Sequence, residues 1–113
     1  MAADLDLLRG TLDLFVLKTL TWGPMHGLGI VRWIERVSKD GLQVEEGALY
    51  PALHRMEQRG WIEGEWGATE QGRRARFYRL TAAGRRAYAA QLETWNRYTS
   101  VAQRILSARG AVT

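Results

Sequence analysis

Arginine is the residue type whose number and spacing most directly predict chemistry in this 113-residue chain. Lysine and arginine number 16 against 12 aspartates and glutamates, and only Lys18 and Lys39 are lysines. Six arginines and no acidic residue occur between Gly72 and Arg86. A guanidinium pairs bidentately with phosphate and with guanine, so a run of arginines without acids predicts an anion-binding surface. GC-rich codon usage is the alternative explanation for the arginine content alone.

Catalytic and metal-binding chemistry has few candidate residues. The sequence has two histidines, His26 and His54, no cysteine, and no pair of carboxylates in a recognisable catalytic motif. The glycine-rich stretch "GPMHGLG" follows a predicted helix, whereas a phosphate-binding loop follows a strand. We therefore predict a protein that is not an enzyme, with no catalytic residues, no cofactor and no metal.

The N-terminal stretch "MAADLDLLRG" carries acids where a signal peptide carries basic residues, and Lys18 interrupts the apolar run that follows. No apolar segment reaches the length that spans a bilayer. The lack of cysteine excludes disulfides and thiol redox chemistry. These features predict a cytoplasmic protein that does not bind membranes.

Hydrophobic periodicity predicts the elements that position the arginines. Apolar residues at helical spacing predict four helices, over residues 4–21, 28–39, 46–59 and 81–108. Gly41 is expected to end the second helix and Gly60 the third. Residues 42–44 are expected to form a short strand. The alternating stretches 61–66 and 74–80 predict a hairpin, and the polar link "GATEQGRR" predicts a mobile tip.

Pro51 limits where the third helix begins. Proline has no backbone N–H and costs about 3 kcal/mol in a helix interior, but the first turn tolerates it. With Gly47 as the cap, Pro51 is the fourth helical residue, so the helix starts near residue 46. The expected buried stripe is Leu49, Leu53 and Met56. The residues expected largely on the opposite, exposed side are Ala48, Pro51, Ala52 and Arg55, with Tyr50 and His54 on one flank.

The last helix carries an apolar repeat with alternating steps of four and three residues. Its members are Tyr88, Leu92, Trp95, Thr99, Ala102 and Leu106. Such a seam is typical of helices that pair, so we expect a second copy of the chain to cover it about a twofold axis. Leu8 and Leu12 of the first helix are expected to join this interface. Trp95 is expected to fill it.

The order of elements predicts a winged helix-turn-helix, mainly helical with a small β-hairpin wing (α+β), plus a long C-terminal dimerisation helix. We expect residues 1–80 to form a DNA-binding domain and residues 81–113 to form the dimerisation helix, packed with helix 4–21. In this fold the third helix enters the major groove of double-stranded DNA, and the wing contacts the backbone or the minor groove. The predicted DNA-binding residues are His26, Gly27, Ala48, Tyr50, Pro51, His54, Arg55, Arg73, Arg74 and Arg76.

These residues have different expected roles. The start of the second helix offers N–H groups to a phosphate, and Tyr50 donates its hydroxyl to one. His54 and Arg55 read bases or phosphates, while the wing arginines mainly supply affinity. The competing interpretation is a winged helix that binds a protein and not DNA. The arginines of the wing favour DNA, since a protein-binding wing does not need them.

Three stretches, "MHGLGIVRWIE", "EEGALYPALHRMEQRGWIEGEW" and "RRARFYRLTAAGRR", resemble the PadR family of bacterial transcriptional regulators. The resemblance covers about residues 8–87, and "LYPALHRME" followed by "GWI" is its most specific part. It implies a homodimeric repressor that binds a palindromic operator, with Tyr50 and the wing arginines on DNA. Small multidrug-binding members use an aromatic-lined pore between dimer halves, so the resemblance also implies an alternative role for Trp95. In that alternative a small hydrophobic or aromatic effector stacks between Trp95 and its symmetry mate. The chain lacks the large C-terminal domain of longer members and is similar to the short subclass.

Overall fold

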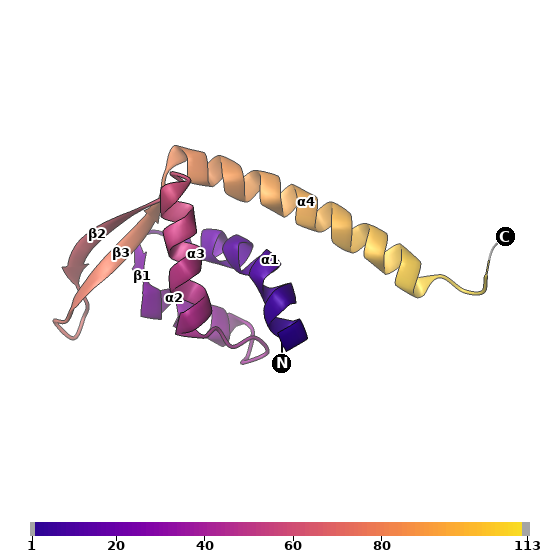
Figure 1. Ribbon diagram of the computed structural model, residues 1–113, viewed down its shortest axis with the longest axis horizontal. Helices are drawn as coiled ribbons and strands as arrows, with labels where there is room; N and C mark the ends of the chain where they lie inside the picture. The colour runs from indigo at the N-terminus through magenta and orange to yellow at the C-terminus, as the bar shows by residue number, and fades with distance from the viewer. Residues whose placement is uncertain (1, 112–113) are drawn as a thin grey trace.

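The structure, a computed structural model, describes the backbone of residues 2–111 and the side chains of residues 11–111. Its elements are α1 (Ala2–Leu20), β1 (Met25–His26), α2 (Gly27–Val37), α3 (Glu46–Gln58), β2 (Ile62–Ala68), β3 (Arg74–Leu80) and α4 (Ala82–Ser107). Figure 1 shows the hairpin β2–β3 projecting from one side of the helices and α4 running away from them on the other. This confirms the predicted winged helix-turn-helix of α+β class with a long C-terminal helix.

The sheet is antiparallel in the order β1–β3–β2. The two strands of the wing pair along all seven residues of each. On the other side of β3, Met25 pairs with Tyr78 and His26 with Phe77. The short strand therefore precedes α2, and it attaches the start of that helix directly to the base of the wing.

Residues 42–44, predicted to be the short strand, are instead an unpaired connection, so that prediction was wrong. Side chains take the place of a strand partner for this segment. The N–H of Val44 donates to Glu35 Oε2 at 3.3 Å, and the N–H of Leu42 donates to Ser38 Oγ at 3.2 Å. Because Glu35 of α2 and its C-cap Ser38 supply these acceptors, the N–H groups of Leu42 and Val44 need no neighbouring strand.

The second helix also ends earlier than predicted. It stops at Val37 with Ser38 as its C-cap, and Gly41 does not supply the stop. Lys39 and Asp40 instead take the left-handed conformation, with φ of 52° and 59°. Aspartate tolerates this region better than most residues, which permits the turn without glycine.

The third helix begins at Glu46 with Glu45 as N-cap, so Gly47 is not the cap and Pro51 is the sixth helical residue. Proline at this position removes only the bond to the Gly47 carbonyl, near the start of the helix. The predicted start near residue 46 is confirmed, and so is the end: Gly60 follows with φ of +74°. The helix stays intact because its apolar stripe packs on the core.

The core lies between the four helices and the base of the wing. The predicted stripe of α3 is fully buried, and Ala52, expected on the exposed side, is buried with it at 0% exposure. The other large buried side chains come from α1, α2 and the wing base: Leu12, Val16, Leu17, Leu20, Ile30, Ile34, Ile62 and Leu80. The core therefore covers the face of α3 that carries Leu49, Ala52, Leu53 and Met56. The opposite face remains open for contact with another molecule.

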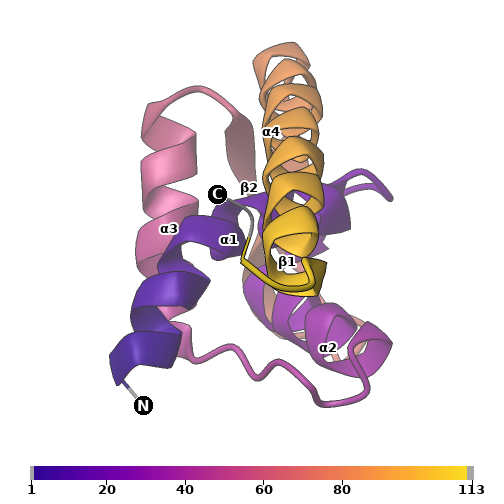
Figure 2. The same ribbon diagram turned by 90° about the vertical axis from the view of Figure 1, so that its right-hand side faces the viewer.

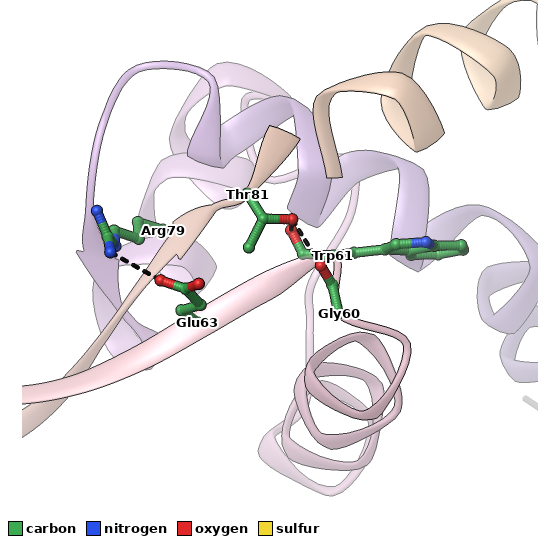
Figure 3. A network of polar contacts seen from close by, with 5 residues as sticks. All are labelled: Gly60, Trp61, Glu63, Arg79 and Thr81. Carbon is green, nitrogen blue, oxygen red and sulfur yellow. Dashed lines mark hydrogen bonds and ion pairs between the residues drawn. The ribbon is translucent and has the colours of Figure 1, made fainter. Parts of the chain in front are cut away.

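A compact joint connects the end of α3, the start of the wing and the start of α4 (Figure 3). Thr81 is the N-cap of α4: its Oγ1 accepts the N–H of Gly84 at 3.0 Å and donates to the carbonyl of Gly60 at 2.6 Å. Its own N–H donates to the carbonyl of Trp61 at 3.0 Å. From this joint α4 crosses α1 and extends beyond the domain, giving the molecule a long axis of 62 Å (Figures 1 and 2). Within the described residues, no helix is long and apolar enough to cross a membrane.

Candidate nucleic-acid interface

A groove of about 430 Å³ lies where the wing meets the start of α2 and the first half of α3. The predicted residues that line it are His26, Gly27, Tyr50, Arg73, Arg74 and Arg76. They come from three separate stretches of the sequence, and the fold brings them together. Three guanidinium groups and the positive end of a helix dipole therefore border one concavity. Such an arrangement suits an anion the size of a backbone phosphate.

Gly27 leaves room for the ring of Tyr50. A Cβ on Gly27 would lie 3.0 Å from both Cε1 and the hydroxyl oxygen of Tyr50, closer than ordinary van der Waals contact. Tyr50 is 47% exposed, so one side of the ring lies against α2 while another remains accessible in the groove. The contact fixes the hydroxyl beside the start of α2 before any ligand arrives.

We expect Gly27→Ala to weaken DNA binding by displacing the Tyr50 ring. A hydrogen bond from the hydroxyl to a charged phosphate stabilises a complex by roughly 1.5 kcal/mol, which corresponds to about tenfold in affinity. Fluorescence anisotropy with a labelled duplex measures the change. The control is a double-mutant cycle with Tyr50→Phe: the effect of Gly27→Ala disappears in that background if it acts through the hydroxyl. An equal loss in both backgrounds would assign the effect to the backbone of α2 instead.

His26 holds the start of α2 against the wing. Its Nδ1 accepts the N–H of Gly29 at 3.1 Å, which makes it the N-cap of the helix. Its ring meets Phe77 of β3 edge-on, with ring centroids 5.3 Å apart. Since Nδ1 accepts a hydrogen bond, the neutral ring carries its proton on Nε2. His26 therefore orients the groove wall through its cap and its ring contact.

Arg73 and Arg74 have no carboxylate partner among the described side chains. Arg74 stacks on Trp66, with Cζ 4.4 Å from the ring centroid. A guanidinium stacked on an indole keeps its N–H edges available for phosphate. The tip is closed by Thr69, whose Oγ1 accepts the N–H of Arg73 at 3.1 Å, and by Gly72 with φ of +79°. The turn therefore presents two accessible cations at the end of the wing.

Two other wing arginines are paired with glutamates. Arg76 Nη2 lies 2.5 Å from Glu57 Oε2 of α3. Arg79 Nη2 lies 2.7 Å from Glu63 Oε2 across the hairpin (Figure 3). The arginine run that lacks acids in the sequence thus meets acids from neighbouring elements in space. Arg73 and Arg74 are accordingly the stronger candidates for phosphate contact.

Arg55 faces α1 and does not lie on the exposed side where the sequence placed it. Its Nη2 lies 3.1 Å from Oδ1 of Asp13, and the side chain of Asp13 is only 14% exposed. Turning Arg55 toward a ligand would leave this largely enclosed carboxylate without its partner, which is costly. Arg55 therefore ties α3 to α1 in the free protein.

The remaining predicted residues of α3 lie outside the groove. Pro51 and His54 are exposed on the surface of the helix, while Ala48 is partly buried against the core. Of these three, His54 alone has a side chain that can hydrogen-bond to a base edge. His54 is therefore the predicted base-contacting residue of α3 whose side chain is accessible.

Sequence reasoning missed five groove residues: Leu28, Trp66, Thr69, Ala75 and Tyr78. Trp66 follows the strand alternation of Ile62, which is buried, yet it is 56% exposed because the hairpin has left the core by that point. A tryptophan beside a cluster of arginines is the signal that could have found it, since aromatic rings and guanidinium groups recur together at nucleic-acid surfaces.

Of the residues predicted for self-association, Leu12 is 2% exposed in a single chain and belongs to the chain's own core. Its assignment to an interface is therefore wrong, and Leu8 lies outside the residues whose side chains are described. The predicted seam of α4 is partly buried at Tyr88, Leu92, Trp95 and Ala102, and open at Leu106. A neighbouring strip that the sequence analysis did not single out, Tyr98, Val101 and Ile105, is between 44% and 68% exposed.

The winged helix-turn-helix and its arginine-lined groove define a DNA-binding protein by class. The chain belongs to the transcriptional regulator PadR-like family, whose sequence profile matches residues 16–90. Members of this family are transcriptional regulators and not enzymes, and the chain is a DNA-binding transcriptional regulator of this kind. The family predicted from the sequence is thereby confirmed, and the assignment favours DNA over a purely protein-binding role.

The chain is similar to several known sequences and solved structures. Transcriptional regulator Rv3488 of Mycobacterium tuberculosis (strain ATCC 25618 / H37Rv) is 35% identical over 79 residues, which are 70% of each chain. A transcriptional regulator from Clostridium thermocellum has a TM-score of 0.80 at 28% identity, covering 88% of this chain and 96% of its own. A PadR family transcriptional regulator from Eggerthella lenta has a TM-score of 0.78 at 27% identity, covering 96% and 92%.

Proposed function

We propose that the chain is a homodimeric repressor of a palindromic operator, with residues 1–80 as the DNA-binding domain and residues 81–113 as the dimerisation helix. The observation that carries the DNA contact is the groove that gathers Tyr50, Arg73 and Arg74 at the start of α2. With α3 in the major groove, this concavity takes the adjacent phosphate backbone. Tyr50 and the start of α2 position the phosphate, and the two arginines neutralise its charge.

Self-association is supported by the apolar surface of α4. Its 26 residues span about 39 Å, and its far half carries Tyr98, Val101, Ile105 and Leu106 in the open. A second copy related by a twofold axis covers the same strip on both helices at once. Two domains then present two α3 helices to one duplex, with half-sites roughly 34 Å apart or a multiple of that distance.

Trp95 has a defined place in this proposal. It is partly buried on the seam of α4, and we assign it to filling the interface between the two copies. Release by a small hydrophobic or aromatic effector stacked between the two Trp95 rings remains the alternative. It does not change the expected DNA contacts.

Selection from a random duplex library, followed by footprinting, tests the operator proposal. We expect an enriched palindrome protected over two half-sites. His54→Ala is expected to alter base preference at one position of each half-site by roughly 1–3 kcal/mol, because the side chain reads a base edge. Tyr50→Phe is the matched comparison, since loss of a phosphate contact lowers affinity for all sequences alike. Enrichment of a single asymmetric site by the parent, or no enrichment at all, would contradict the proposal.

A further inference from the structure

We infer that Arg76 is a positioning residue that fixes the angle of the wing against α3, and that it is not a phosphate ligand. This inference rests on the DNA-binding function proposed above and revises the DNA-contact role that the sequence suggested for Arg76. It also gives Glu57 and Gly64, which have no role in that proposal, a part in fixing this angle.

The first observation is the contact between Arg76 and Glu57. Arg76 lies on β3 and Glu57 in the last turns of α3, and their side chains meet at 2.5 Å. The two side chains are 35% and 28% exposed, so the pair is partly shielded from solvent. A charge-assisted hydrogen bond of this kind is stronger than a neutral one and has a defined direction. It joins the wing to α3 at a point well away from the turn at Gly60.

The second observation is the space above Gly64 of β2. A Cβ on Gly64 would overlap Nε of Arg76 and lie 2.7 Å from its Cζ and Nη2. The guanidinium therefore passes directly over the backbone of β2 on its way to Glu57. Any side chain at position 64 would push the guanidinium aside, because the end of an arginine is the mobile partner in such a clash. The absence of a side chain at Gly64 therefore permits the ion pair between Arg76 and Glu57.

The third observation is the enclosure of Tyr78 next to this pair. The ring is 7% exposed, and Arg76 Cζ lies 5.9 Å from its centroid. Burial, and then the negative charge of Glu57, raise the pKa of the Tyr78 phenol, so the ring stays neutral in the cluster. The hydrogen bond from Arg76 to Glu57 in turn raises the pKa of the Arg76 guanidinium. The three side chains thus form one connected wall between α3 and β3.

Charge decides between the two roles of Arg76. If Arg76 turned toward a phosphate, Glu57 would be left beside the DNA without its partner, and a bare carboxylate repels the backbone. If the pair persists, the two charges cancel and Arg76 adds little attraction. Its contribution is then the angle between α3, which reads bases, and the wing tip, which holds phosphates. An error in that angle affects the cognate site more than random sequence, because only the cognate site needs both contacts at once.

Glu57→Gln tests this inference because the two roles predict opposite signs. A positioning role predicts weaker operator binding, with the ratio of specific to nonspecific affinity falling about tenfold and the salt dependence unchanged. A phosphate-ligand role predicts tighter binding, since the change removes a carboxylate and frees a cation. Gly64→Ala perturbs the same bridge without altering any charge and is expected to act like Glu57→Gln. Tighter operator binding by either variant would overturn the inference.

Arg73→Gln and the double variant Arg76→Gln with Glu57→Gln provide the matched comparison in the salt series. Arg73→Gln is expected to make the slope of log K against log salt shallower by about 0.9 per copy, as for one lost phosphate contact. The double variant removes both charges of the pair and is expected to leave the slope unchanged. The exchanged pair Glu57→Arg with Arg76→Glu is expected to recover part of the specificity lost in either single change. A shallower slope for the double variant, or no recovery, would contradict the positioning role. A parent protein with no salt-dependent binding would instead refute the proposed function itself.

Discussion

Gly84→Ala is expected to destabilise the folded chain by about 3 kcal/mol, the upper end of the usual cost of overpacking. A Cβ on Gly84 would overlap the carbonyl oxygen of Trp61 and lie 2.9 Å from its carbonyl carbon. These are backbone atoms, so no rotamer change relieves the clash. The start of α4 would have to move, and with it the cap at Thr81 that connects α4 to the end of α3 (Figure 3).

Urea denaturation monitored by circular dichroism measures the change in the free energy of unfolding. The sign of that change distinguishes a steric clash from an effect of helix propensity. In an unobstructed helix, replacing glycine with alanine stabilises by about 1 kcal/mol, so helix propensity alone predicts the opposite result. Ser100→Ala, on an exposed part of the same helix, is the control for the effect of helix propensity on stability. Thr81→Ala is expected to cost roughly 1 kcal/mol through loss of the cap. A Gly84→Ala protein as stable as the parent would contradict the close packing of Gly84 against the Trp61 carbonyl.

Trp95→Asp is expected to give a monomer and to reduce operator affinity by roughly 10²–10⁴-fold. The aspartate would place a charge inside the proposed interface, where burial without a partner is costly. The affinity falls because two linked domains bind two half-sites with a high effective concentration, and separate domains lose this advantage. Affinity for a duplex with a single half-site is expected to change little.

Light scattering reports the mass, and titration of one- and two-half-site duplexes reports the affinity. Asn96→Asp introduces the same charge at the adjacent, exposed position of α4 and serves as the matched control. A Trp95→Asp protein that keeps the parent's mass would contradict the assignment of Trp95 to the interface. A parent that is itself monomeric at working concentration would contradict dimerisation through α4.

The fold could be predicted from the sequence because its signals are local. Helical periodicity marked the helices and alternation marked the hairpin. Pro51 placed the start of α3 near residue 46, where it lies, although Gly47 is not the cap. The short strand was misplaced because β1 is only two residues long and is defined by its pairing with β3, which no local pattern announces. The connection 42–44 is stabilised differently, since the side chains of Glu35 in α2 and of its C-cap Ser38 accept two of its N–H groups.

The sequence predicted many of the residues that line the site, but not the ion pairs that some of them form. The sequence identified Tyr50 and the wing arginines, which do meet in one groove. It could not show that Arg55 and Arg76 are engaged with Asp13 and Glu57, because these partners lie 42 and 19 residues away along the chain. Ion pairs of this kind depend on the tertiary arrangement, so an arginine count overstates the charge that is free to bind a ligand.

The salt dependence of duplex binding decides whether Arg73 and Arg74 at the wing tip hold the DNA backbone. The measurement compares the slope of log K against log salt for the parent and for the double variant Arg73→Gln with Arg74→Gln. A dimer that loses four phosphate contacts is expected to show a slope shallower by about 3.6 units, with its fold and mass unchanged. An identical slope for the two proteins would show that the wing tip does not contact the phosphates.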